Sequence, residues 1–172
     1  MPKFTAPDGT SFDSKPAYRD YMMANYYSVR NKSNLEIMKM PGDIDGQVFE
    51  IGDCENVVVV IMDHISQLNI DNCCNSKFFI GACAGSIFIR NCSNTTLYSC
   101  CQQLRLRDCV NSQFFTFSGS EVHIELSSAC RFGPFHGGYP EHEDQLGKAG
   151  LDPEGHSLWY QIFDHNDPYK TG

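Results

Sequence analysis

The chain has 172 residues, of which 41% are hydrophobic, and its 21 acidic and 13 basic residues give a formal net charge of −8. This length suffices for one globular domain with a sizeable core. The acidic balance excludes broad, non-specific nucleic-acid binding, which needs a basic surface, and it disfavours an anionic membrane surface as a partner.

The N-terminal residues MPKFTAPDG lack the apolar core of a signal peptide, and Pro2 stands where N-myristoylation requires glycine. The longest apolar run, 57–62, is too short to cross a bilayer. We therefore expect a cytoplasmic chain without a membrane anchor.

Residues 1–45 form an N-terminal extension in which segment 14–30, SKPAYRDYMMANYYSVR, predicts a helix. Pro16 stands early, where a helix tolerates proline. Apolar or aromatic side chains recur at helical spacing, at Tyr18, Met22, Tyr26 and Val29. This helix is expected to cap the domain that follows.

Residues 46–135 contain a repeat with a period of 17–19 residues. The four clear copies are VFEIGDCENVVVVI (48–61), QLNIDNCCNSKFFI (67–80), SIFIRNCSNTTLYS (86–99) and QLRLRDCVNSQFFT (103–116). They share an aliphatic position (Ile51, Ile70, Ile89, Leu106), a cysteine position (Cys54, Cys73, Cys92, Cys109) and an asparagine position (Asn56, Asn75, Asn94, Asn111). A degenerate fifth copy, EVHIELSSACRF, places Ile124 and Ser127 in register.

This period predicts a solenoid. The leucine framework of leucine-rich repeats is absent, and each copy is instead a set of short strand-like stretches separated by Asn, Ser or Gly. We therefore predict an all-β fold, a parallel β-helix with coils of about 18 residues, in which equivalent residues stack about 4.8 Å apart. The cysteines then face inward at a corner, and the asparagines supply the unusual turn dihedrals there.

Residues 136–172 are expected to form a loop and a second cap. A short helix is expected at 141–149, and segment 157–165, SLWYQIFDH, carries the only tryptophan and is expected to cover the open sheet edge. His142 lies among three acidic residues, but a solvated acidic run is a better interpretation than a metal site. The whole chain reads as one domain.

The nine cysteines are expected to be reduced and structural. No secretory signal supports disulfides, and no C-x-x-C pair supports zinc, since the close pairs are adjacent residues. Neither a metal nor another cofactor is expected.

Strand alternation points Arg105 and Arg107 outward if Leu104 and Leu106 point inward. The repeat register places Arg107 between Arg90 and Glu125, in the column Gly52, Asp71, Arg90, Arg107, Glu125. We therefore expect Arg107 to be structural and paired with Glu125.

Arg105 lies in the column Glu50, Asn69, Phe88, Arg105, His123, where no acid adjoins it. Gln102 lies three residues earlier, near the preceding corner. An unpaired arginine stacked on Phe88 suits an incoming anion, although a solvated surface arginine is an equal alternative on these residues alone.

The string CQQLRLRDC resembles the signature of the tubulin-binding cofactor C domain family. The strings PGDIDGQVFEIGDCENV, GSIFIRNC and SLWYQIFDH also resemble its retinitis pigmentosa 2 branch, so that the resemblance covers about residues 41–165. It implies a right-handed parallel β-helix, in agreement with the repeat.

The resemblance also implies GTPase activation by an arginine finger. By motif position the finger is Arg105, with Gln102 as a supporting polar residue and Glu125 on the same face. The partner-binding residues are expected to be Phe88, Arg107, His123, Glu125, Phe163 and His165. His165 departs from the pattern of the retinitis pigmentosa 2 branch, which has phenylalanine there, and Phe163 is a candidate substitute.

The sequence leaves open two functions that act on GTP hydrolysis. The first is a GTPase-activating protein for an Arf-like small GTPase, linked to ciliary, flagellar or microtubule-associated trafficking. The second is a tubulin-folding factor of the cofactor C type that acts on GTP hydrolysis by tubulin. A non-catalytic cytoskeletal scaffold is a third alternative, which the CQQ-x-R string disfavours. The expected location is the cytoplasm, at the cilium or flagellum base or on the cytoskeleton.

Overall fold

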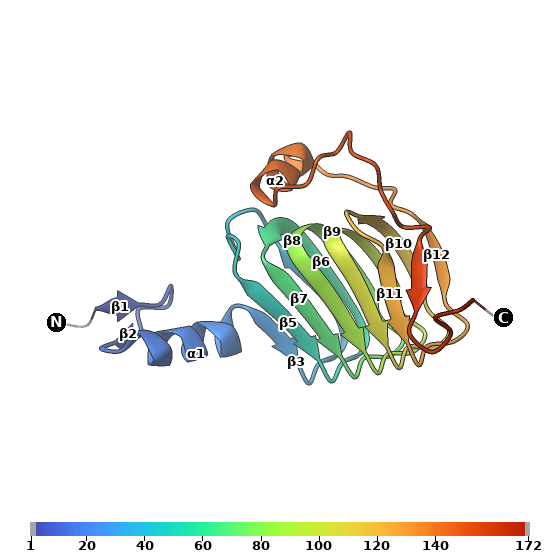
Figure 1. The fold of residues 1–172 in the computed structure, drawn as a ribbon. Helices are drawn as coiled ribbons and strands as arrows, with labels where there is room; N and C mark the ends of the chain where they lie inside the picture. The colour runs from blue at the N-terminus through green and yellow to red at the C-terminus, as the bar shows by residue number, and fades with distance from the viewer. Residues whose placement is uncertain (1–2, 171–172) are drawn as a thin grey trace.

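The computed structural model describes residues 3–170 and shows a parallel β-solenoid of about six turns with two short helices (Figure 1). The predicted all-β coil is thereby confirmed. The solenoid strands are β3 (Ser28–Arg30), β4 (Ser33–Lys39), β5 (Val48–Gly52), β6 (Glu55–Ile65), β7 (Gln67–Asp71), β8 (Lys77–Arg90), β9 (Thr96–Arg107), β10 (Gln113–Ser118), β11 (Val122–Glu125) and β12 (Arg131–Pro134). The remaining elements are β1 (Phe4–Thr5), β2 (Ser11–Phe12), α1 (Lys15–Asn25), α2 (His142–Lys148) and β13 (Ile162–Asp164).

Two main stacks of parallel strands form most of the solenoid wall, and a shorter third stack runs through Ile65, Cys83, Cys101 and Ser118. We call face A the stack of β3, β5, β7, residues 86–90 of β8, residues 103–107 of β9, and β11. Face B is the stack of β4, β6, residues 77–80 of β8, residues 96–99 of β9, β10 and β12. The pairing on face A follows the aliphatic positions of the repeat, from Ile51 through Ile70, Ile89 and Leu106 to Ile124. The predicted register is confirmed.

The corner between the two faces explains the Asp/Asn-Cys-x-Asn string. The first and last residues of this string have φ between 51° and 55° in four successive coils, a left-handed conformation that Asn and Asp tolerate better than other non-glycine residues. Their side chains bond from coil to coil: Asn91 donates to Asn72 over 2.8 Å, and Asn94 donates to Asn75 over 3.2 Å. The asparagine ladder therefore stabilises both the turn and the stacking.

The cysteine between them points into the coil and donates its thiol to the carbonyl two residues earlier. The Sγ–O distance is 3.2–3.4 Å at Cys54, Cys73, Cys92 and Cys109. In the degenerate coil Ser127 makes the same bond to Glu125 over 2.9 Å. A small side chain with one donor is thus what this corner requires.

The interior is aliphatic and aromatic. Its largest fully buried side chains include Phe49, Phe78 and Phe114, and isoleucine, leucine, valine and cysteine hold most of the other inward positions. Complete burial of such a side chain contributes about 1.5–3 kcal/mol. This continuous core makes each coil depend on its neighbours.

The change of period from 19 to 17 residues occurs at one corner. In β8 two residues separate Ile80 from Cys83, and two more separate Cys83 from Ser86. In β9 the three residues that pair with them are separated by only one residue each time. Gln102 is one of those single residues. The coil that carries Arg105 therefore turns more tightly than the coil before it.

The N-terminal cap is shorter than the sequence indicates. Ser14 caps α1 by accepting the Ala17 N–H, and the helix stops at Asn25 rather than at residue 30. Residues 28–30 are a strand instead, because they find paired partners in β5. With β4 they form a coil that the repeat pattern does not reveal. The antiparallel pair β1–β2 and α1 project from this end of the solenoid (Figure 1).

The C-terminal segment returns to the end of the solenoid. The strand β13 pairs in parallel with β11 and so extends face A, and α2 occupies 142–148 of the expected 141–149. Glu143 and Asp144 are exposed, but His142 turns toward the solenoid, with Nε2 2.8 Å from the Gly81 carbonyl. Within residues 3–170 no cluster of three metal-ligating side chains occurs, and neither helix of this part could span a bilayer.

Candidate functional site

Two neighbouring columns of outward side chains on face A contain the predicted site. The first column is Glu50, Asn69, Phe88, Arg105 and His123, and β13 adds Phe163 to it. The second is Arg30, Gly52, Asp71, Arg90, Arg107 and Glu125. Both columns have the predicted neighbours.

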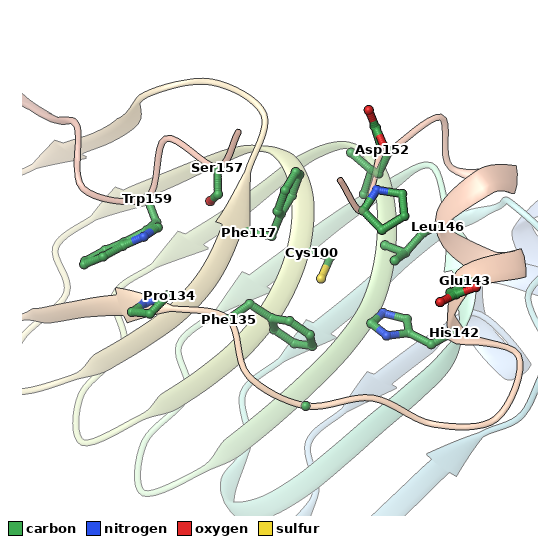
Figure 2. A pocket seen from close by; sticks show the side chains of 13 residues that line it. Cys100, Phe117, Pro134, Phe135, His142, Glu143, Leu146, Asp152, Ser157 and Trp159 are labelled. Atoms are coloured by element: carbon green, nitrogen blue, oxygen red, sulfur yellow. The ribbon is translucent and has the colours of Figure 1, made fainter. Parts of the chain in front are cut away.

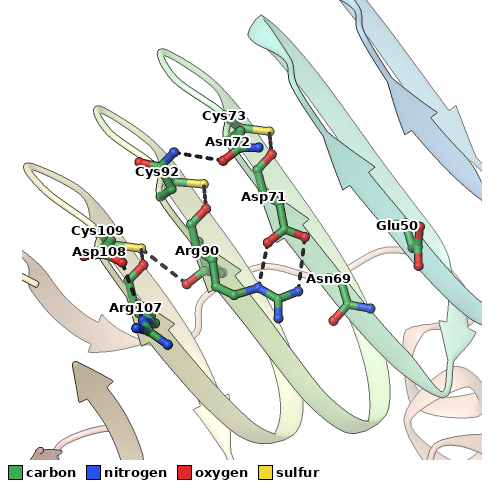
Figure 3. Close-up of polar contacts among 12 residues, drawn as sticks. Glu50, Asn69, Asp71, Asn72, Cys73, Arg90, Cys92, Arg107, Asp108 and Cys109 are labelled. Carbon is green, nitrogen blue, oxygen red and sulfur yellow. Dashed lines mark hydrogen bonds and ion pairs between the residues drawn. The ribbon is translucent and has the colours of Figure 1, made fainter. Parts of the chain in front are cut away.

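Charges in the second column are paired, some closely and some loosely. Arg90 binds Asp71 through two contacts, with Nε 2.6 Å from one carboxylate oxygen and a terminal nitrogen 3.1 Å from the other (Figure 3). Arg107 has only long contacts, 3.6 Å from Nε to Asp108 and 4.0 Å to Glu125. The expected Arg107–Glu125 pair exists, but at the limit of an ion pair and with both side chains about half exposed.

Arg105 differs from every arginine in the second column. It is exposed, and its guanidinium has neither an ion pair nor a hydrogen bond with any residue between 3 and 170. Its Cζ lies 6.0 Å from the centre of the Phe88 ring, and Cζ of Arg90 lies 5.9 Å from the same ring. Such a contact contributes about 0.5–1 kcal/mol at an exposed site. Phe88 therefore braces a guanidinium whose donors are all available.

A shallow depression surrounds this arginine. It has a volume of about 220 Å³. Its lining residues are Phe88, Arg90, Arg105, Leu106, Arg107, His123, Glu125 and His165. Three arginines meet one glutamate there, so the depression is a locally cationic spot on an acidic protein. That charge suits an anionic ligand or the acidic rim of a partner.

The C-terminal segment completes the depression. Because β13 pairs with β11, Phe163 lies beside His123, with ring centres 5.5 Å apart, and His165 follows at the edge. Nδ1 of His123 lies 3.0 Å from Nε2 of His165. The structure thus brings together all six residues that were expected to bind a partner, although their roles stay predictions.

Gln102 lies apart from them. It occupies the tight corner before Arg105, as expected, but it does not line the depression. Its amide lies across Gly119, where a β-carbon would come within 2.7 Å of Oε1. Any supporting role for Gln102 therefore requires a partner that reaches around this corner.

The deeply buried cysteines with a raised pKa provide no reactive thiolate near the site. All nine cysteines are free, and burial raises the pKa of the Cys83 and Cys100 thiols to about 12 and that of Cys109 to about 11. A hydrogen bond with the Cys92 thiol instead lowers the pKa of Cys73. A neutral thiol is a poor nucleophile and a poor metal ligand. These residues serve packing.

The sequence did not indicate a second hollow, which lies between α2 and the end of face B (Figure 2). It measures about 350 Å³ and includes Cys100, Phe117, Phe135, Leu146 and Trp159 in its wall. The hollow forms because the segment between β12 and β13 crosses the end of the sheet. The lone tryptophan in 157–165 was the only sequence signal for it.

The chain is similar to proteins of one known family. A family model described as "Tubulin binding cofactor C" matches residues 46–165. "Protein XRP2" from Homo sapiens is 40% identical over 146 residues, which are 85% of this chain and 40% of that protein. "Tubulin-specific chaperone C" from Homo sapiens is 26% identical over 137 residues, 78% of this chain and 39% of that protein.

A solved structure supports the fold. "Tubulin Binding Cofactor C from Leishmania major" superposes with a TM-score of 0.55 at 18% identity, over 85% of this chain and 84% of that one. The chain spans about two fifths of the length of the curated relatives named above. What those whole proteins do is therefore not carried over by similarity alone.

Proposed function

The chain belongs to the tubulin binding cofactor C family, and from that premise we propose that it activates a partner GTPase by supplying Arg105 in trans. The proposed partner is a GTP-bound Arf-like small GTPase. One observation carries the proposal: Arg105 is the arginine of face A that is exposed, braced by Phe88 and left with neither an ion pair nor a hydrogen bond within residues 3–170.

The chemistry of GTP hydrolysis needs such a group. Negative charge develops on the transferred phosphoryl group and the leaving oxygen, and an arginine from outside the GTPase stabilises it. Fingers of this kind accelerate hydrolysis roughly 10³–10⁵-fold, which is about 4–7 kcal/mol of barrier. An arginine already bound to a carboxylate, such as Arg90, would first have to break that pair.

The residues around Arg105 suit a docking surface. Phe163 and His123 form an aromatic wall on one side, while Arg107 and Glu125 hold each other only loosely on the other. Loose pairs can exchange partners at little cost, since exposed ion pairs contribute about 0–1 kcal/mol. Arg107 and Glu125 can therefore pair with charges of the GTPase without weakening the fold.

The test uses a panel of purified Arf-like GTPases loaded with GTP, in a single-turnover phosphate-release assay. Wild-type protein should accelerate at least one of them roughly 10³-fold or more, Arg105→Ala should lose roughly 10²–10⁴ of that, and Gln102→Ala should fall between. The matched control is Arg30→Ala, which removes an arginine from face A that is bound to Glu50 and lies far along the stack. Its rate should equal that of the wild type.

A panel in which GTP-loaded members bind but none is accelerated would overturn the proposal and favour a non-catalytic scaffold. Equal rates for Arg105→Ala and the wild type would do the same for the finger itself.

Tubulin is the second candidate partner. It is favoured by the similarity to a protein named tubulin-specific chaperone C and by the matching family description. The same assay with GTP-loaded tubulin separates the two partners, because the finger would act on either one and only the accelerated substrate differs.

The location that fits either partner is the cytoplasm, at the base of a cilium or flagellum or along the cytoskeleton. We propose this location from the kind of partner alone. Fluorescence imaging of the tagged chain together with a basal-body marker and a microtubule marker tests it, and a signal confined to another compartment would contradict it.

A further inference from the structure

We propose that the hollow between α2 and the end of face B binds a small organic amine, a molecule with one apolar body and one ammonium group. The hollow shares no lining residue with the depression around Arg105, so this inference is independent of the proposed GTPase activation. Its starting point is that apolar walls and carboxylates occupy different ends of one cavity (Figure 2).

The floor and walls of the hollow are apolar. Cys100 of β9 and Phe117 of β10 are paired neighbours that form the floor, and Leu146 of α2 belongs to the same hydrophobic cluster. Phe135 and Trp159 add two aromatic rings to the wall (Figure 2). The volume of about 350 Å³ lies within the range of small-molecule pockets, which are mostly apolar with a few polar groups. An aromatic or aliphatic body therefore suits this end.

Carboxylates stand at the end opposite the tryptophan. Glu143 and Asp152 are both exposed there (Figure 2). Glu143 has neither an ion pair nor a hydrogen bond with any residue between 3 and 170, and Asp152 uses only Oδ1, which accepts the Glu154 N–H over 3.0 Å. Among the described residues that line the hollow there is neither lysine nor arginine. A ligand with a positive charge would complement this end.

The aromatic rings favour the same charge. The face of a ring carries negative partial charge, and it attracts an ammonium group, most strongly when the ring is that of tryptophan. Burial raises the pKa of the Cys100 thiol to about 12, so the floor adds no charge of its own near neutral pH. An anion would be repelled by two carboxylates, and an uncharged molecule would gain from the walls alone.

The walls are held in place by hydrogen bonds to the solenoid. The two residues before the tryptophan are fastened to β10: Ser157 Oγ accepts the Ser118 N–H over 3.0 Å, and the Leu158 N–H donates to the Ser118 carbonyl over 2.8 Å. On the other side, Nε2 of His142 lies 2.8 Å from the Gly81 carbonyl. A ligand that enters a preformed site loses less affinity to ordering of the protein.

The experiment uses the full chain and three probes that share a phenyl ring on a short carbon chain: phenethylamine, phenethyl alcohol and hydrocinnamate. At neutral pH they carry a positive charge, no charge and a negative charge. Trp159 is the only tryptophan of the chain, so its fluorescence reports occupancy of the hollow, and isothermal titration calorimetry gives the Kd. The amine should bind as one saturable equivalent, roughly 10-fold more tightly than the alcohol, and hydrocinnamate should bind more weakly than either.

The double variant Glu143→Gln, Asp152→Asn removes both carboxylates and keeps the shape of the side chains. It should weaken amine binding roughly 5–10-fold and leave the affinity for the alcohol unchanged. The matched control is the double variant Asp144→Asn, Glu154→Gln, which changes the net charge equally by removing two exposed carboxylates that do not line the hollow. It should bind the amine as the wild type does.

Three results would overturn the proposal. In the first, no probe binds the wild type up to its limit of solubility. In the second, the alcohol binds the wild type as tightly as the amine does. In the third, the control variant loses as much affinity for the amine as the variant without Glu143 and Asp152.

Discussion

The corner ladders and the Arg105 column are both built by the repeat, yet they differ in what the repeat conserves from coil to coil. At the corner, similar side chains return in each coil and most of them bond to the equivalent residue of a neighbouring coil, as Asn91 bonds to Asn72. In the column the residue changes in every coil, from Glu50 through Phe88 to His123. Uniform, mutually satisfied positions hold the solenoid together. A column whose residues vary, and in which Arg105 has no ion pair with the described residues, can bind another molecule.

The largest effect on stability should come from breaking a ladder. Asn94→Ala removes two side-chain hydrogen bonds, to Asn75 and Asn111. It also places alanine, which lacks the side-chain amide, in the left-handed conformation at φ 51°. We expect a loss of about 2 kcal/mol in the free energy of unfolding, measured by urea denaturation.

Asn94→Gly separates the two causes. Glycine accepts the left-handed conformation but makes no ladder bonds, so it should lose about half as much as alanine. Equal losses for the two variants would show that backbone conformation contributes nothing at this corner.

The buried thiols predict a loss of stability at alkaline pH. The pKa of Cys83 is raised by burial from an ordinary value of 9.0 to about 12. Its contribution is complete below pH 9 and falls as the pH rises toward 12, because the thiol ionises only in the unfolded chain over that range. At pH 10 the loss is about 1 kcal/mol for this residue.

Urea denaturation of the wild type and of Cys83→Ala between pH 8 and pH 10, under a non-thiol reductant, measures this slope. The variant should be less stable at every pH but should lose less between the two limits. Parallel slopes would contradict the assignment to Cys83.

A stabilising change is expected in the degenerate coil, where the ladder of Asn and Asp side chains is interrupted. Leu126 stands in the degenerate coil at φ 48°, in the position that Asn91 and Asp108 occupy in the preceding coils, and its side chain is 52% exposed. Leu126→Asn should restore a residue that tolerates this conformation and lose little apolar burial. We expect a gain of about 0.5–1 kcal/mol. A lower thermal midpoint would contradict this reading of the corner.

The smallest effect should come from the loosely paired arginine. Arg107→Ala removes contacts of 3.6 and 4.0 Å at an exposed position, so we expect less than about 0.5 kcal/mol in urea denaturation. The sequence had assigned Arg107 mainly to stability, because a column of opposite charges predicts neighbours but not their distances. A loss comparable to that of Asn94→Ala would restore the earlier interpretation.

The fold was predictable because the repeat records the register. Once Cys54, Cys73, Cys92 and Cys109 are aligned, the strands, the inward faces and the two columns follow. The coil of β3 and β4 was missed because Lys32 stands where the other coils have cysteine, and Ser28–Arg30 resemble the end of a helix until β5 pairs with them.

The site was predictable in position and not in detail. The register places Arg105 between Phe88 and His123, but the contact between His123 and His165 depends on how β13 returns to the solenoid after a long loop. No local pattern fixes that return. The hollow beside α2 depends on the same loop, and so does the turn of His142 toward Gly81.

The central claim is that Arg105 is kept for a partner and not for the fold. Its most direct test measures three quantities on Arg105→Ala and Arg105→Lys: the thermal midpoint, the Kd for the GTP-loaded partner and the single-turnover rate of hydrolysis. The midpoint should stay at the wild-type value and the Kd should change only a few-fold. The rate should fall roughly 10²–10⁴-fold for Ala, with no rescue by Lys, whose ammonium cannot reproduce the planar fork. A wild-type rate in Arg105→Ala, or a lowered midpoint that accounts for the lost rate, would contradict the claim.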